Sequence, residues 1–339
     1  KGHQVIVLEQ QEGKAMQAIA KDLTSQNIEV FLGKSLELSN LEPWLDNLKT
    51  IVISPGIPWD HPTLMQARSK GIHIQGEMGL AWQHLKEIPW IGITGTNGKT
   101  TVTHLLNHVL ETNGVLAPMG GNVGHAATEL ALTWSESKVT KPHWLVMELS
   151  SYQIEAAPEI KPQIGLWTNL TPDHLDRHGD LKKYRKIKSS LIKHSKNRIF
   201  NGDDPYLKSQ RQNWEHGIWV SAEGPGTKEH SADLWINDSG MVASKNGTLF
   251  SASCLNLPGR HNLQNMLMVT AAALKAGLNP DVIHSSLSTF KGVPHRLEKL
   301  GELKGMTVFN DSKATNYEAA SMGIQAVHSP SLIIAGGRT

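Results

Sequence analysis

Short apolar runs alternate with helical patterns along residues 1–86. The runs at 5–8, 28–32 and 50–53 are typical of buried strands, and the apolar spacing over 14–23 predicts a helix. Buried strands that alternate with helices form parallel sheets, in which ligands bind beyond the carboxyl ends of the strands. We therefore expect this segment to form an α/β domain with a ligand site at its strand ends.

Two strand ends in this segment carry candidate ligand contacts. Glu9 follows the first strand, where its carboxylate could bond a ribose or a uracil. Ser54 and Gly56 follow the third strand, where the backbone could approach a phosphate. Proline and glycine also build ordinary turns, so a plain turn at Pro55 and Gly56 is the alternative for this second strand end.

The most specific pattern of the chain lies at residues 88–110. An apolar run at 91–93 enters a glycine-rich turn, and apolar positions at helical spacing begin at Val102. N–H groups in such a turn converge on phosphates, and the following helix adds the positive end of its dipole. The residues expected to bind the phosphates of a nucleotide are Gly95, Thr96, Asn97, Gly98, Lys99, Thr100 and Thr101.

Within this turn, Lys99 would reach the terminal phosphates and Thr100 would place its hydroxyl on Mg²⁺, as in P-loop nucleotide enzymes. The strict P-loop pattern has a glycine where this chain has Ile93. A chance glycine-rich turn with a surface lysine is the alternative. The strand before the turn and the helix after it favour the phosphate loop.

Two later strands of the same block end in residues that suit a metal site. Apolar residues at 144–147 lead to Glu148, and a strand at 164–167 leads to a segment that contains His174. A strand-end acid beside a phosphate loop is placed to hold Mg²⁺, directly or through water. Read alone, Glu148 could be a buried or capping glutamate and His174 a hydrogen-bonded structural histidine. Together they favour a second metal or phosphate ligand at His174, whose segment also crowds together a second histidine, two aspartates and an arginine.

Further polar residues suit a nucleotide site. Asn262 and Asn265 lie one helical turn apart at the start of an apolar helix, so their amides face the same way. They either cap this helix or read the edge of a nucleobase. A later strand is followed by Asp311, Lys313 and Thr315. These would bring a carboxylate, a cation and a hydroxyl to the opening of one binding site, unless they form a solvated turn.

The remaining segments offer less chemistry. Residues 120–124 predict a flexible turn that exposes the amide of Asn122. Short strand-like pieces at 213–255 suggest a small antiparallel appendage, 300–309 predict a hairpin, and 331–335 predict a strand that starts another βα unit.

Composition limits the class of protein. The chain has 339 residues, 39% apolar and 19% charged, and its 33 basic and 31 acidic residues nearly cancel. This describes a globular protein of two or three domains, without a nucleic-acid partner. Because no run of eighteen apolar residues exists, we expect no membrane span. Cys254, the one cysteine, cannot form an internal disulfide and fits a reducing compartment, so we expect a cytoplasmic protein.

Taken together, these motifs resemble the Mur ligase family, the ATP-dependent amide-forming enzymes of peptidoglycan synthesis. The resemblance covers essentially the whole chain. Its motifs are GTNGKTT at 95–101, GNVG at 121–124, ELSSYQ at 148–153, NLTPDHLDRHG at 169–179, YRKIK at 184–188, LPGRHNLQN at 257–265, HRLE at 295–298 and NDSKATN at 310–316. Within the family, SPGIP at 54–58, SSYQ, HRLE and NDSKATN are most similar to the members that add D-glutamate.

The resemblance implies a three-domain α/β architecture. Residues 1–86 would form a Rossmann-like UDP-sugar-binding domain whose first strand precedes Lys1. Residues 87–292 would form the central P-loop-type ATPase domain with a mostly parallel sheet, and 293–339 the start of a Rossmann-like C-terminal domain that binds amino acid and nucleotide. The chain is thus expected to be truncated at both ends, with most of the third domain beyond Thr339.

The resemblance also implies a reaction. ATP and UDP-N-acetylmuramoyl-L-alanine would give an acyl phosphate, which the amine of D-glutamate attacks to form the peptidoglycan precursor. The expected partners are these small molecules with Mg²⁺, two ions in number, and the expected state is a monomer. The alternatives are a related ligase that adds another amino acid, and a nucleotide-binding fragment without ligase activity.

The family motifs finally imply a role for each matching residue. Lys188, in YRKIK, would be the carbamylated lysine, because an ammonium disfavoured by burial and nearby cations reacts as free amine with CO₂. The expected catalytic residues are Lys99, Glu148, His174 and Lys188. The expected metal ligands are Thr100, Glu148, His174 and carbamylated Lys188. The expected substrate contacts are Asn262 and Asn265 with adenine, Arg296 with phosphate, Asp311 with ribose, Lys313 and Thr315 with nucleotide and amino acid, Asn122 with the muramoyl group, Ser54 and Gly56 with the UDP diphosphate, and Glu9 with the uridine.

Overall fold

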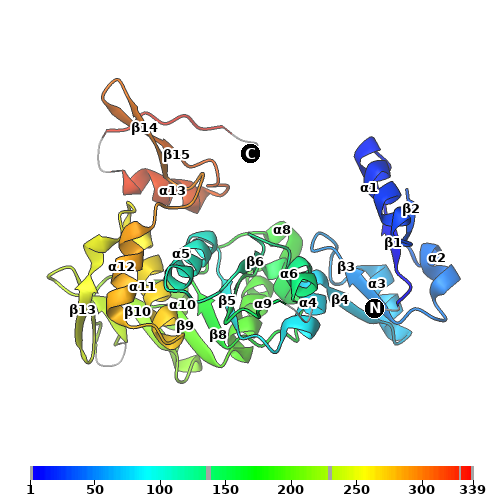
Figure 1. The fold of residues 1–339 in the computed structure, drawn as a ribbon, viewed down its shortest axis with the longest axis horizontal. Coiled ribbons are helices and arrows are strands. Elements are labelled where there is room, and N and C mark those ends of the chain that lie inside the picture. The colour runs from blue at the N-terminus through cyan, green and yellow to red at the C-terminus, as the bar shows by residue number, and fades with distance from the viewer. Residues whose placement is uncertain (1–2, 135–138, 228–230, 328–329, 337–339) are drawn as a thin grey trace. The chain divides into compact units, whose positions relative to one another are not determined.

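The structure is a computed structural model that describes residues 3–134, 139–227, 231–327 and 330–336. The chain divides into two compact units, Lys1–Gly76 and Glu77–Thr339 (Figure 1). Helix α4 (Glu77–Leu85) belongs to the second unit, where the Glu77 carboxylate accepts hydrogen bonds from the backbone and hydroxyl of Thr128. The division into three domains at residues 86 and 292 stays a prediction. No helix in the described ranges is long and apolar enough to cross a membrane.

The first unit contains two parallel strand pairs. Strand β1 (Ile6–Glu9) pairs with β2 (Glu29–Leu32) across helix α1 (Lys14–Ser25), as its apolar pattern predicts. Strand β3 (Thr50–Ile53) pairs with β4 (His73–Gly76). The helices α2 (Leu38–Leu41) and α3 (Pro62–Ser69) complete this unit, with a short 3₁₀ turn at Glu42–Trp44.

The second unit is built on a nine-stranded sheet in the order β13-β12-β11-β10-β9-β8-β5-β7-β6. All neighbours from β6 to β11 are parallel. The strands are β5 (Trp90–Thr94), β6 (Met119–Gly121), β7 (Leu145–Glu148), β8 (Ile164–Trp167), β9 (Asn197–Asn201), β10 (Ile218–Ser221), β11 (Leu234–Ile236), β12 (Met241–Ser244) and β13 (Gly247–Ser251).

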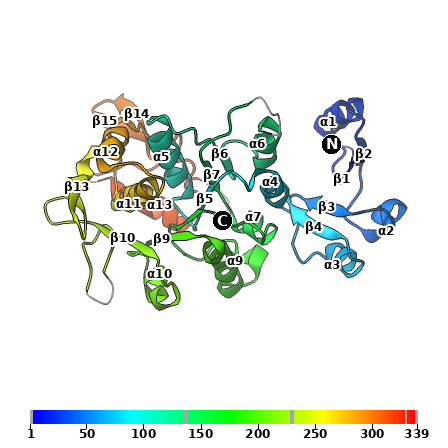
Figure 2. The same ribbon diagram turned by 60° about the horizontal axis from the view of Figure 1, so that its bottom comes forward.

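Helices cover both faces of this sheet (Figure 2). In β5, Ile91 and Ile93 join a core with helices α5, α11 and α12, whereas Trp90 joins a second core with α4, α6, α7 and α9. Burial on both faces explains why the strand reads as a continuous apolar run. The helices are α5 (Lys99–Glu111), α6 (Ala127–Thr133), α7 (Ser151–Glu155), α8 (Leu175–His178), α9 (Leu181–His194), α10 (Pro205–Ser209), α11 (Arg260–Lys275), α12 (Pro280–Thr289) and α13 (Tyr317–Ala326), with 3₁₀ turns at Arg211–Asn213 and Ala252–Cys254.

Three segments differ from the sequence-based predictions. The prediction of a separate antiparallel appendage at 213–255 is wrong, because β10 and β11 continue the parallel sheet and only β12 and β13 are antiparallel. The turn predicted at 120–124 begins as β6, which pairs with the edge of β7. The strand predicted at 331–335 is wrong, since these residues pair with no other described strand. The predicted hairpin is confirmed as β14 (Glu298–Leu303) and β15 (Met306–Asn310).

Candidate active site

The phosphate loop connects β5 to α5, and two of its glycines have backbone conformations that other residues disfavour. Gly95 has φ +149° and Gly98 has φ +81°. A Cβ on Gly95 would lie 1.9 Å from Thr168 Oγ1, and one on Gly98 would lie 2.9 Å from Asn265 Oδ1. Backbone conformation therefore favours glycine at both positions, and close packing against Thr168 and the Asn169 backbone adds to this at Gly95.

Asn169, which follows β8, holds the phosphate loop through its side chain. Its Oδ1 accepts from the N–H groups of Thr96 at 3.1 Å and Asn97 at 2.8 Å. Its Nδ2 donates to the carbonyl of Asn97 at 3.1 Å, to which Thr168 Oγ1 also donates, at 2.6 Å. The N–H groups of residues 99–101 begin α5 and have no intrahelical acceptor, so they are the ones placed to bind phosphate.

Two lysine side chains meet at the carbonyl of Gly95. Lys99 Nζ donates to this oxygen at 2.9 Å, and Lys188 Nζ, from α9, donates to it at 2.7 Å. Lys188 is 1% exposed. Burial, and then the neighbouring Lys99 ammonium, lowers the pKa of Lys188 well below its usual value. Asp173 and Glu148 oppose this shift. Two cations that share one carbonyl repel each other, so the more buried Lys188 loses its proton more readily.

Glu148 ends β7 opposite Ile93 of β5, which places its carboxylate at the edge of the sheet that carries the phosphate loop. The side chain is 1% exposed. Its Oε1 accepts from Asn122 Nδ2 at 2.8 Å, whereas Oε2 is buried without a hydrogen-bond partner among the described residues. It does not cap α7, whose N-terminal cap is Ser150. A buried carboxylate oxygen without a donor fits a cation, so this residue suits the expected metal.

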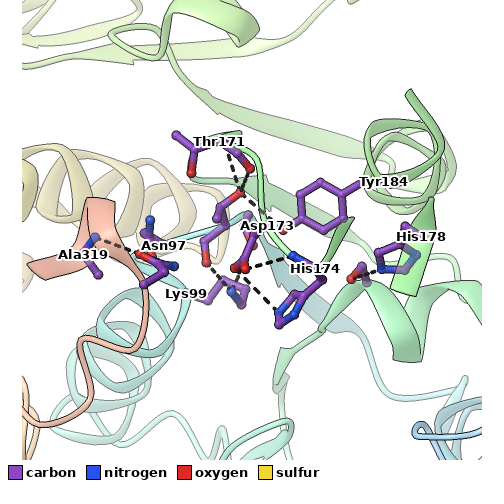
Figure 3. A network of polar contacts seen from close by, with 12 residues as sticks. Asn97, Lys99, Thr171, Asp173, His174, His178, Tyr184 and Ala319 are labelled. Carbon is purple, nitrogen blue, oxygen red and sulfur yellow. Dashed lines mark hydrogen bonds and ion pairs between the residues drawn. The ribbon is translucent and has the colours of Figure 1, made fainter. Parts of the chain in front are cut away.

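His174 follows β8, on the other side of β5 from Glu148. Its backbone lies in the left-handed region at φ +51°, which is uncommon for a residue with a side chain. Asp173 accepts from the His174 N–H at 3.0 Å and lies 3.6 Å from its Nε2. Figure 3 shows Asp173 between Lys99 and His174. Within the described ranges, no three His, Cys, Asp or Glu side chains gather as a metal group.

A pocket beside the phosphate loop collects most of the residues predicted to bind nucleotide. The predicted residues that line it are Asn97, Gly98, Thr101, Asn262, Asn265, Arg296 and Asp311. The two asparagines do not cap α11, because Gly259 occupies the cap position. Instead Asn262 Nδ2 donates to Pro258 O, and Asn265 Nδ2 donates to Asn262 Oδ1 at 3.3 Å.

A second pocket adjoins the first at Arg296, which lines both. Thr100, Asn122 and Lys313 line this pocket as well. Arg296 Nη2 donates to Thr100 Oγ1 at 3.0 Å, so the arginine contacts the hydroxyl that was predicted to face Mg²⁺. The pocket therefore presents two cations to a ligand beside the phosphate loop.

Comparison with known proteins identifies the family. Residues 93–273 match the Mur ligase middle domain. A UDP-N-acetylmuramoylalanine–D-glutamate ligase from Prochlorococcus marinus (strain MIT 9313) is 61% identical over 338 residues, which cover 100% of this chain and 74% of that protein. The chain belongs to the Mur ligase family. A protein of the same name from Synechococcus sp. (strain CC9605) is 57% identical over 99% of this chain and 73% of its own length.

Solved structures confirm the α/β fold of this Mur ligase. The MurF ligase of Thermotoga maritima in complex with ADP has a TM-score of 0.60 at 18% identity, covering 96% of this chain and 72% of that one. The UDP-N-acetylmuramate–alanine ligase of the same organism has a TM-score of 0.58 at 20% identity, covering 96% of this chain and 77% of that one.

Some predicted residues of this Mur ligase lie outside both pockets. Ser54 accepts from the Ile57 N–H at 3.0 Å, so a turn does form at Pro55 and Gly56. Glu9 ends β1 in the other sheet of the first unit, where its carboxylate accepts from the Gln11 N–H at 2.8 Å. Thr315, in the second unit, is exposed and lines neither pocket.

Sequence reasoning missed several residues that surround the phosphate loop of this Mur ligase. Asn169 and Asp173 stand within a recognised motif, yet only contacts across the fold show what they do. Asn316 was missed in the same way, and its Nδ2 donates to Asn97 Oδ1 at 3.2 Å. His104 lines the second pocket, one helical turn beyond Thr100, and this i, i+4 spacing was its available signal.

Proposed function

We propose that this chain is the part of an ATP-dependent ligase that joins D-glutamate to UDP-N-acetylmuramoyl-L-alanine. The names of its relatives and the family of the chain support this reaction. The observation that carries it is the convergence of Lys99, Lys188 and the buried Glu148 carboxylate around the loop after β5. Such a site suits the transfer of a phosphoryl group between two anions.

In the first step, an oxygen of the L-alanyl carboxylate attacks the γ-phosphorus of ATP. The bond from this phosphorus to the β,γ-bridging oxygen breaks, its electron pair leaves with ADP, and an acyl phosphate forms. Both reactants are anions, so the site must offset their repulsion. Lys99 and Arg296 supply positive charge at the loop, and the N–H groups that begin α5 orient the phosphates.

In the second step, the amine of D-glutamate attacks the acyl carbonyl carbon. The carbon–oxygen bond to phosphate breaks, inorganic phosphate leaves with the electron pair, and the nitrogen loses a proton. The residues that would hold Mg²⁺ are Thr100, Glu148, His174 and carbamylated Lys188. When bound, this ion supplies positive charge that neutralises phosphate oxygens. The number of two ions, the monomeric state and the cytoplasmic location belong to this proposal.

The surroundings of Lys188 support the carbamylation that its motif implies. Its free amine attacks the carbon of CO₂, one C=O electron pair moves to oxygen, and the nitrogen releases a proton, which leaves a carbamate anion. Burial and the neighbouring Lys99 ammonium both favour the free amine. The carbamate would replace a cation next to Lys99 with an anion.

Phosphate release in the presence of ATP, UDP-N-acetylmuramoyl-L-alanine and one amino acid at a time tests the proposal. We expect release with D-glutamate and none above background with meso-diaminopimelate or L-lysine. Lys99→Met should abolish release, whereas Lys182→Met, an exposed lysine of α9, should not change it. A preference for another amino acid, or normal turnover by Lys99→Met, would contradict the proposal.

A further inference from the structure

His178 is a buried histidine that the proposed reaction does not use. It ends α8 and is 2% exposed. Its Nε2 shares a hydrogen bond of 2.9 Å with Ser151 Oγ, while Nδ1 is buried without a hydrogen-bond partner among the described residues. The ring packs between two tyrosines, with centroids 5.3 Å from Tyr152 and 5.4 Å from Tyr184. This side chain therefore connects three segments of the site.

Tyr184 links His178 to the phosphate loop (Figure 3). Its hydroxyl lies 3.3 Å from Thr96 Oγ1. Thr96 Oγ1 already donates its only proton to the carbonyl of Thr171, at 3.0 Å, so the tyrosine hydroxyl is the donor. Burial raises the pKa of Tyr184 to about 12, which keeps that proton in place. The position of the Tyr184 ring thus bears directly on the loop.

The same tyrosine ring supports the buried lysine. Lys188 Nζ lies 4.6 Å from the centroid of Tyr184, so the end of the lysine side chain packs against the ring. The opposite neighbour of His178, Ser151, begins α7 three residues after Glu148. A chain of contacts therefore runs from the strand end of Glu148 through Ser151 and His178 to Tyr184.

The imidazole of His178 is neutral at physiological pH. Protonation would make both ring nitrogens donors, and the buried Nδ1–H would have no acceptor among the described residues. Burial, followed by the charge of Arg177, lowers the pKa of His178 to about 4. The neutral ring adds no positive charge beside Arg177.

We propose that His178 is a positioning residue that holds Tyr184, and through it Lys188 and Thr96, against the strand end that carries Glu148. This inference rests on the proposed function and adds to it the contact chain by which β7 and α9 are aligned at the phosphate loop. Among the described residues, no hydrogen bond joins His178 directly to the phosphate loop or to Lys188.

Three substitutions test this role. Ser151→Ala removes the hydrogen-bond partner and keeps the ring, and His178→Phe keeps a ring and removes the bond. His178→Gln keeps an amide that can bond Ser151. Ser286→Ala is the matched control, because Ser286 is another helix serine that is 5% exposed, against 3% for Ser151, and it accepts from Asn113 Nδ2 at 2.8 Å.

Calorimetric ATP binding and the ¹³C signal of a lysine carbamate in labelled bicarbonate are the two readouts. We expect Ser151→Ala and His178→Phe to weaken ATP binding about tenfold and to diminish the carbamate signal, as loss of outer-shell orienting contacts does. Ser286→Ala should leave both unchanged at a similar melting temperature, and His178→Gln should recover part of the loss.

The role of His178 would be overturned if Ser151→Ala and His178→Phe bind ATP as tightly as Ser286→Ala does and show the same carbamate signal. The role would also be overturned if the two variants have a lower melting temperature and a Ser286 variant with the same melting temperature loses ATP binding to the same extent. If the unsubstituted chain binds ATP but releases no phosphate with any amino acid, the proposed ligase reaction fails, and the comparison of ATP affinities still decides on His178.

Discussion

Replacing Gly95 with alanine measures how tightly the fold restricts the phosphate loop. The new Cβ would lie 1.9 Å from Thr168 Oγ1 and 3.2 Å from the Asn169 nitrogen. Rotating the Thr168 hydroxyl away would relieve the first contact, but it would break the 2.6 Å hydrogen bond to the Asn97 carbonyl. The second contact involves backbone and cannot be relieved by a rotamer change.

The expected cost is the sum of three effects. The backbone at φ +149° disfavours a side chain by about 1–2 kcal/mol. Overpacking costs about 1–3 kcal/mol, and loss of the hydrogen bond about 1 kcal/mol. Gly114 is the matched control, since it has φ +71° and nothing within 4 Å of its Cβ position. Gly114→Ala should therefore cost only about 1–2 kcal/mol, and Gly95→Ala about 3–6 kcal/mol.

Urea unfolding followed by tryptophan fluorescence measures both free energies, and calorimetry measures ATP binding by each variant. The double variant Gly95→Ala with Thr168→Ala should lose about 1–2 kcal/mol less than the sum of the two single changes, because the closest contact is then absent. The steric explanation would be refuted if Gly95→Ala is no less stable than Gly114→Ala. It would also be refuted if the double variant loses as much unfolding free energy as the two single variants together.

Three other consequences of the site can be measured. Asn169→Ala should weaken ATP binding about tenfold in calorimetry, because the Asn97 N–H loses its 2.8 Å acceptor. Unchanged affinity would contradict the role of Asn169 in holding the phosphate loop. Arg296→Ala should raise the KM for ATP about tenfold by removing the donor to the Thr100 hydroxyl, while an unchanged KM would place the nucleotide elsewhere. His178 has a pKa of about 4 in the fold against 6.5 in the unfolded chain, so the unfolded chain binds more protons between these values. The free energy of unfolding should then fall by up to about 3 kcal/mol as pH drops from 6.5 to 4, and His178→Phe should show a smaller fall in urea titrations; equal falls would exclude the assignment.

The sequence predicts those parts of the fold whose signal is local. Strand β8 was predicted with its observed bounds, because a strand buried on both faces reads as an unbroken apolar run. The phosphate loop could be predicted for a similar reason, because glycine at positions 95 and 98 itself indicates a backbone with positive φ. Glu148 could be placed at a strand end from the same kind of pattern.

Features that depend on a distant partner could not be predicted. Strand β6 has two glycines and little apolar signal, and it forms because β7 offers an edge to pair with. The direction of β10 follows from its register with β9, which no local pattern contains. Within the site, the contact of Lys188 with Gly95 joins residues 93 positions apart. The motif identifies Lys188, but only the fold shows that it shares its acceptor with Lys99.

This shared acceptor implies different behaviour of the two lysines when a phosphate arrives. Two donors use both lone pairs of the Gly95 carbonyl, so this oxygen can accept no further hydrogen bond. Lys99 is partly exposed at the first turn of α5, and its flexible side chain can exchange this carbonyl for a phosphate oxygen. Lys188 is buried from all sides and stacked on Tyr184, so it has no such freedom. Departure of the Lys99 ammonium would remove the nearest cation from Lys188 and raise its pKa, which favours the carbamate before ATP binds rather than after.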